Sequence, residues 1–141
     1  SDLPITGGLK CKLIIKKGTV IGNYCHIYAT RSITIEEYVL FADNIYIGDN
    51  MHNYIDVTKP IIKQGVIQKN DVVIGSGSWI GENVSIIGAS IGRNCVVGAN
   101  SVVTKDIPDF SVAAGVPARI IKKFDFKTCR WVSLKNEVED K

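Results

Sequence analysis

The feature that most constrains this chain is an aliphatic residue at every sixth position. The repeat first runs through Ile15, Ile21, Ile27, Ile33, Val39 and Ile45. It resumes at Ile74, Ile80 and Ile86 and, after a shift of one residue, continues through Ile91, Val97 and Val103. A hexapeptide period is typical of a parallel β-helix, in which each coil buries its apolar residues only against its neighbours. The sequence therefore predicts an all-β solenoid.

Each hexad is expected to form one short strand and one corner. The β-branched residue points inward, and the glycine that follows it in pairs such as Ile80-Gly81 tolerates the backbone angles of a corner. A second inward position four residues later is predicted to hold Cys25, Val39, Met51, Val84, Cys95 and Ser101. Three hexads make a triangular coil of about 18 residues, so one domain of about five to six coils fits this length.

Composition and charge argue against several other classes of protein. No apolar run approaches the roughly 18 residues of a membrane-spanning helix. The net charge of +3 is mild and no continuous basic face with aromatic readers is visible, so no nucleic-acid partner is expected. The two histidines fall short of the three that bind zinc in β-helical enzymes such as the γ-class carbonic anhydrases, unless two chains share a site, so no metal is expected. The four cysteines lack metal-ligand spacing and no secretory leader is visible, which favours a cytoplasmic location.

The repeat is interrupted between Met51 and Val72, and residues 52–72 are expected to leave the coil as a loop. Insertions in a solenoid project from one side and often form its binding face. His52 lies where the chain leaves the coil, and imidazole is the commonest general base for a hydroxyl group. From position alone, however, a solvated loop histidine is the simpler interpretation of His52. His26 is interpreted as a surface corner residue.

Three segments resemble the hexapeptide-repeat acyltransferases. They are residues 73–84 with Trp79-Ile80-Gly81, residues 91–108 with Thr104-Lys105-Asp106-Ile107-Pro108, and residues 114–122 with Ala114-Gly115-Val116-Pro117-Ala118-Arg119. The similarity, which covers residues from about 15 to 122, is greatest to acetyl-CoA-dependent sugar O-acetyltransferases, including the maltose and galactoside acetyltransferases and those that modify lipopolysaccharide and capsule. It implies a left-handed parallel β-helix assembled as a homotrimer with active sites between subunits. We therefore expect an acyltransferase domain over residues 1–122, with the loop insertion 52–72, and a C-terminal tail over residues 123–141 that forms a strand or hairpin.

The resemblance also implies roles for individual residues. His52 matches the catalytic histidine, and Asn50 stands where lipopolysaccharide-type members have a further histidine, which leaves His52 as the sole candidate base. Independently of the resemblance, Asn50, Tyr54, Asp56 and Lys59 lie close to His52 in the sequence, and this proximity leads us to expect that they face the acceptor. The residues expected to bind acetyl-CoA are Trp79 at its thioester end, Gly81, Ala99 and Ser101 along the pantetheine arm, and Thr104, Lys105, Arg119 and Lys122 at the nucleotide and its phosphates.

The activity implied is direct transfer of an acetyl group from acetyl-CoA to a sugar hydroxyl in surface polysaccharide or lipopolysaccharide biosynthesis. His52 would take the hydroxyl proton while backbone N–H groups stabilise the oxyanion. Two alternatives stay open. The same base could serve the amine of a nucleotide-linked amino sugar, or the β-helix could be a scaffold without catalysis.

Overall fold

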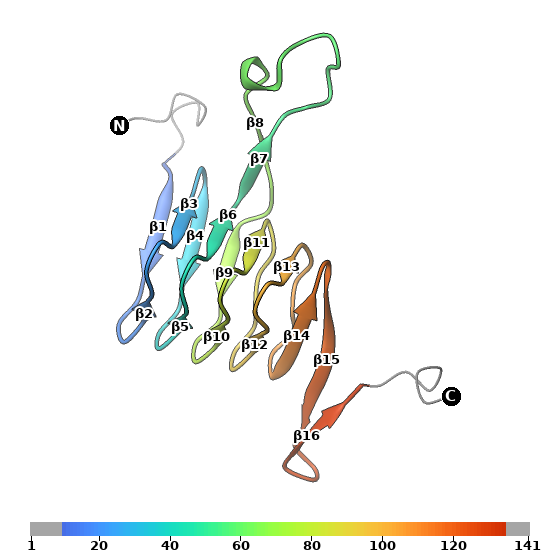
Figure 1. Cartoon of the computed structure of the whole chain (residues 1–141). Helices are drawn as coiled ribbons and strands as arrows, with labels where there is room; N and C mark the ends of the chain where they lie inside the picture. Colours follow the sequence, from blue (N-terminus) through green and yellow to red (C-terminus); the bar gives the residue numbers. More distant parts are fainter. Residues whose placement is uncertain (1–9, 135–141) are drawn as a thin grey trace, which may run out of the picture.

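The computed structural model describes residues 10–134 and shows a parallel β-helix with three faces (Figure 1). Face A contains β1 (Lys12–Ile15), β4 (Ser32–Ile35) and β9 (Val72–Ile74), and single bridges extend it through Ile91 and Ile107. Face B contains β2 (Val20–Ile21), β5 (Leu40–Phe41), β10 (Trp79–Ile80), β12 (Val96–Val97) and β14 (Ser111–Gly115). Face C contains β3 (His26–Tyr28), β6 (Tyr46–Gly48), β11 (Ser85–Ile87) and β13 (Val102–Val103).

The core consists of three columns of inward side chains, one behind each face. The columns are Ile15, Ile35, Ile74, Ile91 and Ile107 on face A, Ile21, Phe41, Ile80, Val97 and Ala113 on face B, and Ile27, Ile47, Ile86 and Val103 on face C. From the second coil onward these side chains are buried. Ile15 and Ile21 in the first coil stay 46% and 36% exposed, because no described coil precedes them.

The six-residue spacing holds at two corners of the coil and fails at the third. From face A to face B the column residues are six apart in every coil, as in Ile35 and Phe41, and the same is true from face B to face C. The corner from face C to face A varies in length, and it also carries the loop insertion. Ile15 therefore stacks on Ile35, and the first coil takes 20 residues instead of about 18. Ile33 is buried as predicted, but two residues before its column position.

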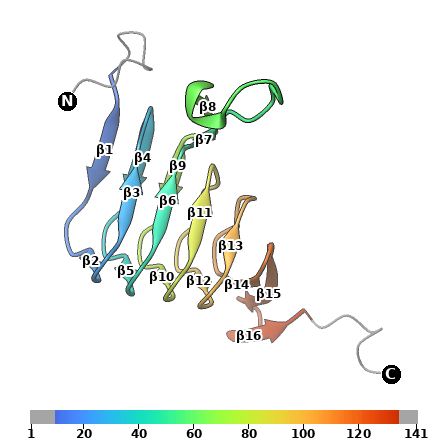
Figure 2. The same cartoon turned by 45° about the horizontal axis from the view of Figure 1, so that its top comes forward.

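The described residues form four complete coils and faces A and B of a fifth, slightly fewer than the five to six predicted. The loop insertion leaves between faces C and A as a hairpin of β7 (Asn50–His52) and antiparallel β8 (Val66–Gln68), which projects from the solenoid (Figures 1 and 2). A short 3₁₀ helix, Ile61–Lys63, lies within it. The prediction of an inward Met51 was wrong, because Met51 pairs with Ile67 in this hairpin.

The C-terminal part closes the solenoid with antiparallel strands. β14 pairs with β15 (Ala118–Asp125), and β15 pairs with β16 (Arg130–Ser133). The tail thus forms a hairpin on the last coil, and the expected boundary between residues 122 and 123 falls within β15. Residues 1–9 and 135–141 of the two expected segments lie outside the described residues.

Candidate active site

A groove of about 270 Å³ lies at the corner between faces B and C. It is lined by Ala42, Trp79, Gly81, Glu82, Val96, Val97, Gly98 and Ala99. Three of the expected acetyl-CoA ligands, Trp79, Gly81 and Ala99, therefore lie together. The lining is mostly apolar, and half of the Trp79 side chain is exposed. A long, largely uncharged chain with a few amide groups fits such a groove.

Gly81 is required by the close approach of two coils beneath this groove. A Cβ atom at position 81 would lie 2.8 Å from both the Ala99 nitrogen and the Val97 oxygen. These are backbone atoms, so neither can move without shifting the next coil. Glycine therefore keeps the two coils at normal strand spacing.

Ser101 supports the groove from within and does not line it. Its side chain is buried, its hydroxyl donates to the Gly98 oxygen at 2.6 Å, and the same hydroxyl accepts from the Gly115 nitrogen at 3.0 Å. The first bond closes the corner at residues 98–101, and the second joins this corner to Gly115 in the last coil. The structure therefore places Ser101 as a support of the corner.

Two of the expected phosphate ligands lie on β15, the strand that continues face B. Lys122 is paired with Val112, which follows Trp79 and Val96 in one outward row. Three strand spacings, roughly 14 Å, thus separate Trp79 from Lys122. Arg119 is paired with Ala114 near the same corner as Gly98. Both cationic side chains are exposed, so they can reach an anionic ligand that extends along face B.

Thr104 and Lys105 lie elsewhere on the same chain. They follow β13 at the corner between faces C and A and are exposed. His52 belongs to this corner too, since β7 leaves the coil there. In Figure 1, β7 and the loop are at the top of the solenoid and β10 is at the bottom. One chain therefore does not bring His52, Thr104 or Lys105 to its own groove.

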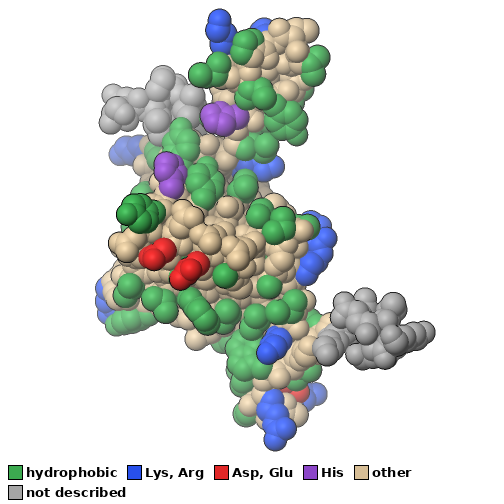
Figure 3. Space-filling view, in the orientation of Figure 1, with side chains coloured by type: hydrophobic (Ala, Val, Ile, Leu, Met, Phe, Trp, Pro, Cys, Tyr) green, Lys and Arg blue, Asp and Glu red, His purple; other side chains and the backbone are tan. Residues whose placement is uncertain are grey.

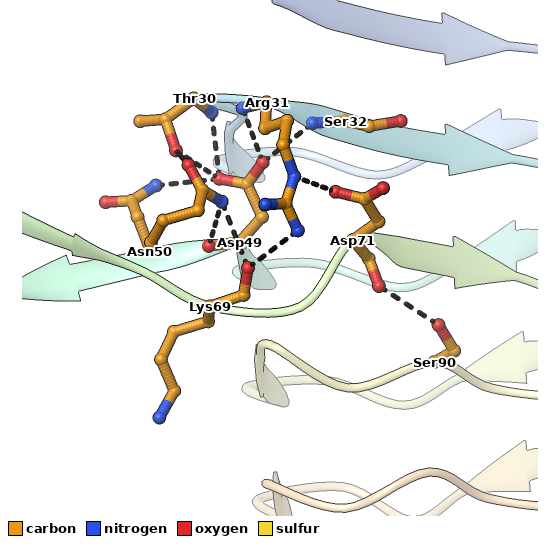
Figure 4. Close-up of polar contacts among 9 residues, drawn as sticks. Thr30, Arg31, Ser32, Asp49, Asn50, Lys69, Asp71 and Ser90 are labelled. Atoms are coloured by element: carbon orange, nitrogen blue, oxygen red, sulfur yellow. Dashed lines mark hydrogen bonds and ion pairs between the residues drawn. The ribbon is translucent and has the colours of Figure 1, made fainter. Parts of the chain in front are cut away.

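His52 is exposed on β7, and a buried carboxylate anchors the base of that strand (Figure 4). Asp49 accepts the backbone N–H groups of Thr30, Arg31 and Ser32 at 2.8, 2.7 and 2.9 Å. The Thr30 hydroxyl donates to the same carboxylate at 2.8 Å. The start of the hairpin is thereby fixed to the corner of the preceding coil.

The hydrogen bonds also set the protonation state of Asp49. Burial alone would raise the pKa of this carboxyl, but hydrogen bonds from Asn50, Thr30 and Arg31 outweigh burial and lower the pKa to about 2. The group is therefore a carboxylate at neutral pH. Sequence reasoning did not single out Asp49, although an acidic residue directly before the interruption of the repeat was a usable signal.

Asn50 does not lie where an acceptor ligand is expected. Its side chain is buried, and its amide donates to the Tyr28 oxygen at 3.2 Å and to Asp49 at 3.0 Å. Tyr54, in contrast, is exposed on the loop. Of the two, only Tyr54 is free to contact a ligand in this arrangement.

The loop beyond His52 has its own hydrogen bonds. The Gln64 amide donates to the Asp56 and Lys59 oxygens at 2.7 and 2.9 Å and accepts from the Asp56 nitrogen at 3.0 Å. The Asp56 carboxylate accepts from the Thr58 nitrogen and hydroxyl at 2.9 and 2.6 Å. Asp56 and Lys59 are therefore held within the loop turn.

Comparison with known proteins identifies the family. The family model "Hexapeptide repeat of succinyl-transferase" matches residues 71–105. The chain is 39% identical over 118 residues to a putative lipopolysaccharide biosynthesis O-acetyl transferase of Escherichia coli K12, covering 79% of this chain and 60% of that protein. It is 34% identical to a maltose O-acetyltransferase structure from Clostridium difficile 630, with a TM-score of 0.56, covering 79% of this chain and 64% of that one. A galactoside acetyltransferase in complex with coenzyme A is 28% identical with a TM-score of 0.55, covering 81% and 66%.

The chain belongs to the hexapeptide-repeat acetyltransferase family, and its fold is the left-handed parallel β-helix of that family. The chain spans only part of the length of the first three curated relatives it matches, namely 60%, 35% and 48% of them. Among residues 10–134, no helix is long and apolar enough to cross a membrane.

Proposed function

We propose that this protein is an acetyl-CoA-dependent O-acetyltransferase that acts in the cytoplasm on a sugar hydroxyl in surface polysaccharide or lipopolysaccharide biosynthesis. The observation that carries the proposal is the groove formed by Trp79, Gly81 and Ala99 on a chain whose relatives are named sugar O-acetyltransferases. The relative bound to coenzyme A supports acetyl-CoA as the donor.

The shape and charge of face B suit that donor. The groove is mostly apolar, which suits the pantetheine arm, and Trp79 adds an aromatic surface to its lining. Arg119 and Lys122 lie on the strand beyond the groove and suit the phosphates, since guanidinium binds phosphate through two parallel hydrogen bonds. In this arrangement the thioester lies beside Trp79.

His52 acts as the general base of a direct transfer. Its imidazole takes the proton of the sugar hydroxyl while the hydroxyl oxygen bonds to the thioester carbonyl carbon. Backbone N–H groups stabilise the oxyanion that forms on the carbonyl oxygen. The carbon–sulfur bond then breaks, and the leaving thiolate takes the proton from the imidazolium. Neither a metal nor an acyl-enzyme is used.

The site needs a second copy of the chain. The groove lies at the corner between faces B and C, whereas His52, Thr104 and Lys105 all belong to the corner between faces C and A. A homotrimer in which one chain's corner with His52 meets its neighbour's groove completes three equivalent sites. Thr104 and Lys105 then contact a donor held mainly by the neighbour, and Tyr54 contacts the acceptor.

Two alternatives give different results in one experiment. The protein is incubated with acetyl-CoA and a panel of sugars and amino sugars, thiol release is followed, and the product is treated with hydroxylamine. Release that depends on the acceptor and a labile product indicate an ester and support the proposal. A resistant product indicates N-acetylation of an amino sugar. No release, together with no binding of acetyl-CoA by calorimetry, would favour a non-catalytic scaffold.

A further inference from the structure

One charged residue lines the groove, and the proposed reaction gives it no role. Glu82 lies at the corner between faces B and C, and the other lining residues are uncharged. Its side chain is exposed, and no ion pair or side-chain hydrogen bond found within residues 10–134 involves its carboxylate. Figure 3 shows acidic side chains gathered on one part of the solenoid, apart from the Lys and Arg side chains drawn there. The Glu82 carboxylate is therefore available to a ligand in the groove.

Asp43 occupies the same corner one coil earlier, but its carboxylate is already engaged. It accepts the Asn23 backbone N–H at 2.7 Å, and a Cβ at Gly22 would lie 2.5 Å from the same carboxylate oxygen. The Asp43 carboxylate therefore turns toward the first coil, and Asp43 is not among the residues that line the groove. Glu82 is left as the carboxylate that meets a ligand in the groove.

Glu82 lies at the level of the solenoid where the acyl group is expected. The proposed donor runs along face B from Arg119 and Lys122 to Trp79, where the thioester lies. Glu82 belongs to the same coil as Trp79, three residues further along the chain, and both line the groove. Strand β15, which carries Arg119 and Lys122, lies three strand spacings, roughly 14 Å, from this coil. Cations thus serve one end of the donor, and a carboxylate borders the other.

A carboxylate at this level distinguishes acyl groups by their charge. The acetyl group is uncharged, so no repulsion opposes its binding beside Glu82. An acyl group that ends in a second carboxylate, such as succinyl, would bring a like charge to the same end of a mostly apolar groove. Like charges repel more strongly where apolar groups replace water, and dissolved salt screens the repulsion. Glu82 therefore opposes the binding of dicarboxylic acyl groups.

We propose that Glu82 is a specificity-determining residue for the acyl donor, and that it excludes coenzyme A thioesters whose acyl group carries a carboxylate. The donors that the groove admits are then those with uncharged acyl groups, to which acetyl-CoA belongs. This inference rests on the proposed function, because it takes the thioester to lie beside Trp79.

The test compares succinyl-CoA with butyryl-CoA, whose acyl group has the same number of carbon atoms and no second carboxylate. Dissociation constants are measured by calorimetric titration at low salt, without any acceptor. The wild type is expected to bind butyryl-CoA at least ~10-fold more tightly than succinyl-CoA. Glu82→Gln keeps the shape of the side chain and removes its charge, so this ratio of dissociation constants is expected to fall by at least ~5-fold.

Two controls separate this effect from a change in net charge and from misfolding of the variant. Glu37→Gln removes the same charge at the corner between faces A and B, and it is expected to keep the wild-type ratio. Raising the salt concentration is expected to lower the wild-type ratio and to change that of Glu82→Gln much less, because salt screens only the repulsion from Glu82. The salt series on the wild type needs no variant.

The outcomes separate this inference from the proposed function. Equal binding of the two thioesters by the wild type, or a ratio that neither Glu82→Gln nor salt changes, would overturn the role of Glu82 and leave the proposed function standing. Selective binding without transfer to any acceptor would contradict the proposed function and leave the role of Glu82 standing. No binding of any acyl-CoA would contradict both.

Discussion

The carboxylate of Asp49 accepts the backbone N–H of Thr30 at 2.8 Å, which joins the base of the β7 hairpin to the corner of the preceding coil. The same carboxylate also accepts the backbone N–H groups of Arg31 and Ser32, so it provides a hydrogen-bond partner for three consecutive backbone donors. The position of His52 therefore depends on a residue three positions earlier in the chain.

Asp49→Ala is expected to reduce the free energy of unfolding by about 3 kcal/mol, because it leaves backbone donors without a partner in a partly buried corner. Asp49→Asn keeps one acceptor oxygen and should lose less. Urea unfolding followed by circular dichroism measures both changes. Equal stability of the three proteins would show that the corner does not depend on this carboxylate.

Acid should destabilise the wild type in a defined range. The pKa of Asp49 is about 2 in the folded chain and 3.8 for the unperturbed group, so the unfolded chain binds the proton first as pH falls. Asp49 therefore contributes its full stabilisation above about pH 5, and about 2 kcal/mol is lost between pH 5 and 2. In Asp49→Asn this part of the loss is absent. Unfolding curves from pH 6 to 2 make the comparison, and parallel pH profiles for both proteins would contradict the assignment.

Adding a side chain to Gly81 should damage the groove. A Cβ there meets backbone atoms of the next coil at 2.8 Å, whereas a Cβ at Gly98 meets the Ala114 methyl group at 3.1 Å. Gly81→Val is expected to weaken coenzyme A binding by ~10-fold or more, and Gly98→Ala by less. Calorimetric titration of each variant provides the measurement. Unchanged affinity in Gly81→Val would place the donor elsewhere.

The two ends of the donor site can be tested separately. Arg119→Gln is expected to weaken binding of coenzyme A by ~10-fold and to leave pantetheine unaffected, because pantetheine lacks the phosphates. Trp79→Ala is expected to weaken both ligands. A loss of pantetheine binding in Arg119→Gln would mean that the substitution disturbs the fold of β15 and not a phosphate contact.

A shared site predicts complementation between inactive variants. The protein should have about three times its 15.4 kDa mass by light scattering. His52→Ala and Gly81→Val, assayed at an acetyl-CoA concentration so low that each has little activity alone, are mixed in equal amounts after unfolding and refolded together. Random assembly then pairs an intact His52 with an intact groove in about a quarter of the sites. A mixture no more active than its components would show that each chain uses its own groove.

The two corners at which spacing stays constant could be read from the sequence, and the third could not. Ile74, Ile80 and Ile86 follow one another at six residues because straight strands and tight corners admit no other length. At the corner between faces C and A, the number of residues differs from coil to coil. Asp49 organises a longer corner there, and the β7 hairpin leaves from it. A six-residue period therefore predicted the fold class and the core but not the length of each coil.

The candidate site was predictable only in part, and for a similar reason. Trp79, Gly81 and Ala99 meet because they lie on adjacent coils at one corner, which the repeat determines. Asn50 resembled a ligand by position, but the side chain turns toward Asp49, and only three-dimensional contacts could show this. Likewise, the separation of His52 from the groove depends on which corner carries the loop, and periodicity alone does not give that.

If His52 is the base of an acetyl transfer, replacing it and replacing His26, the other histidine of the chain, should have very different effects. Thiol release from acetyl-CoA is measured with a monosaccharide acceptor that the wild type uses, for His52→Ala and for His26→Ala. A fall of at least ~10²-fold in kcat is expected for His52→Ala, with acetyl-CoA affinity preserved, and little change is expected for His26→Ala. Full activity in His52→Ala would show that His52 is not the base.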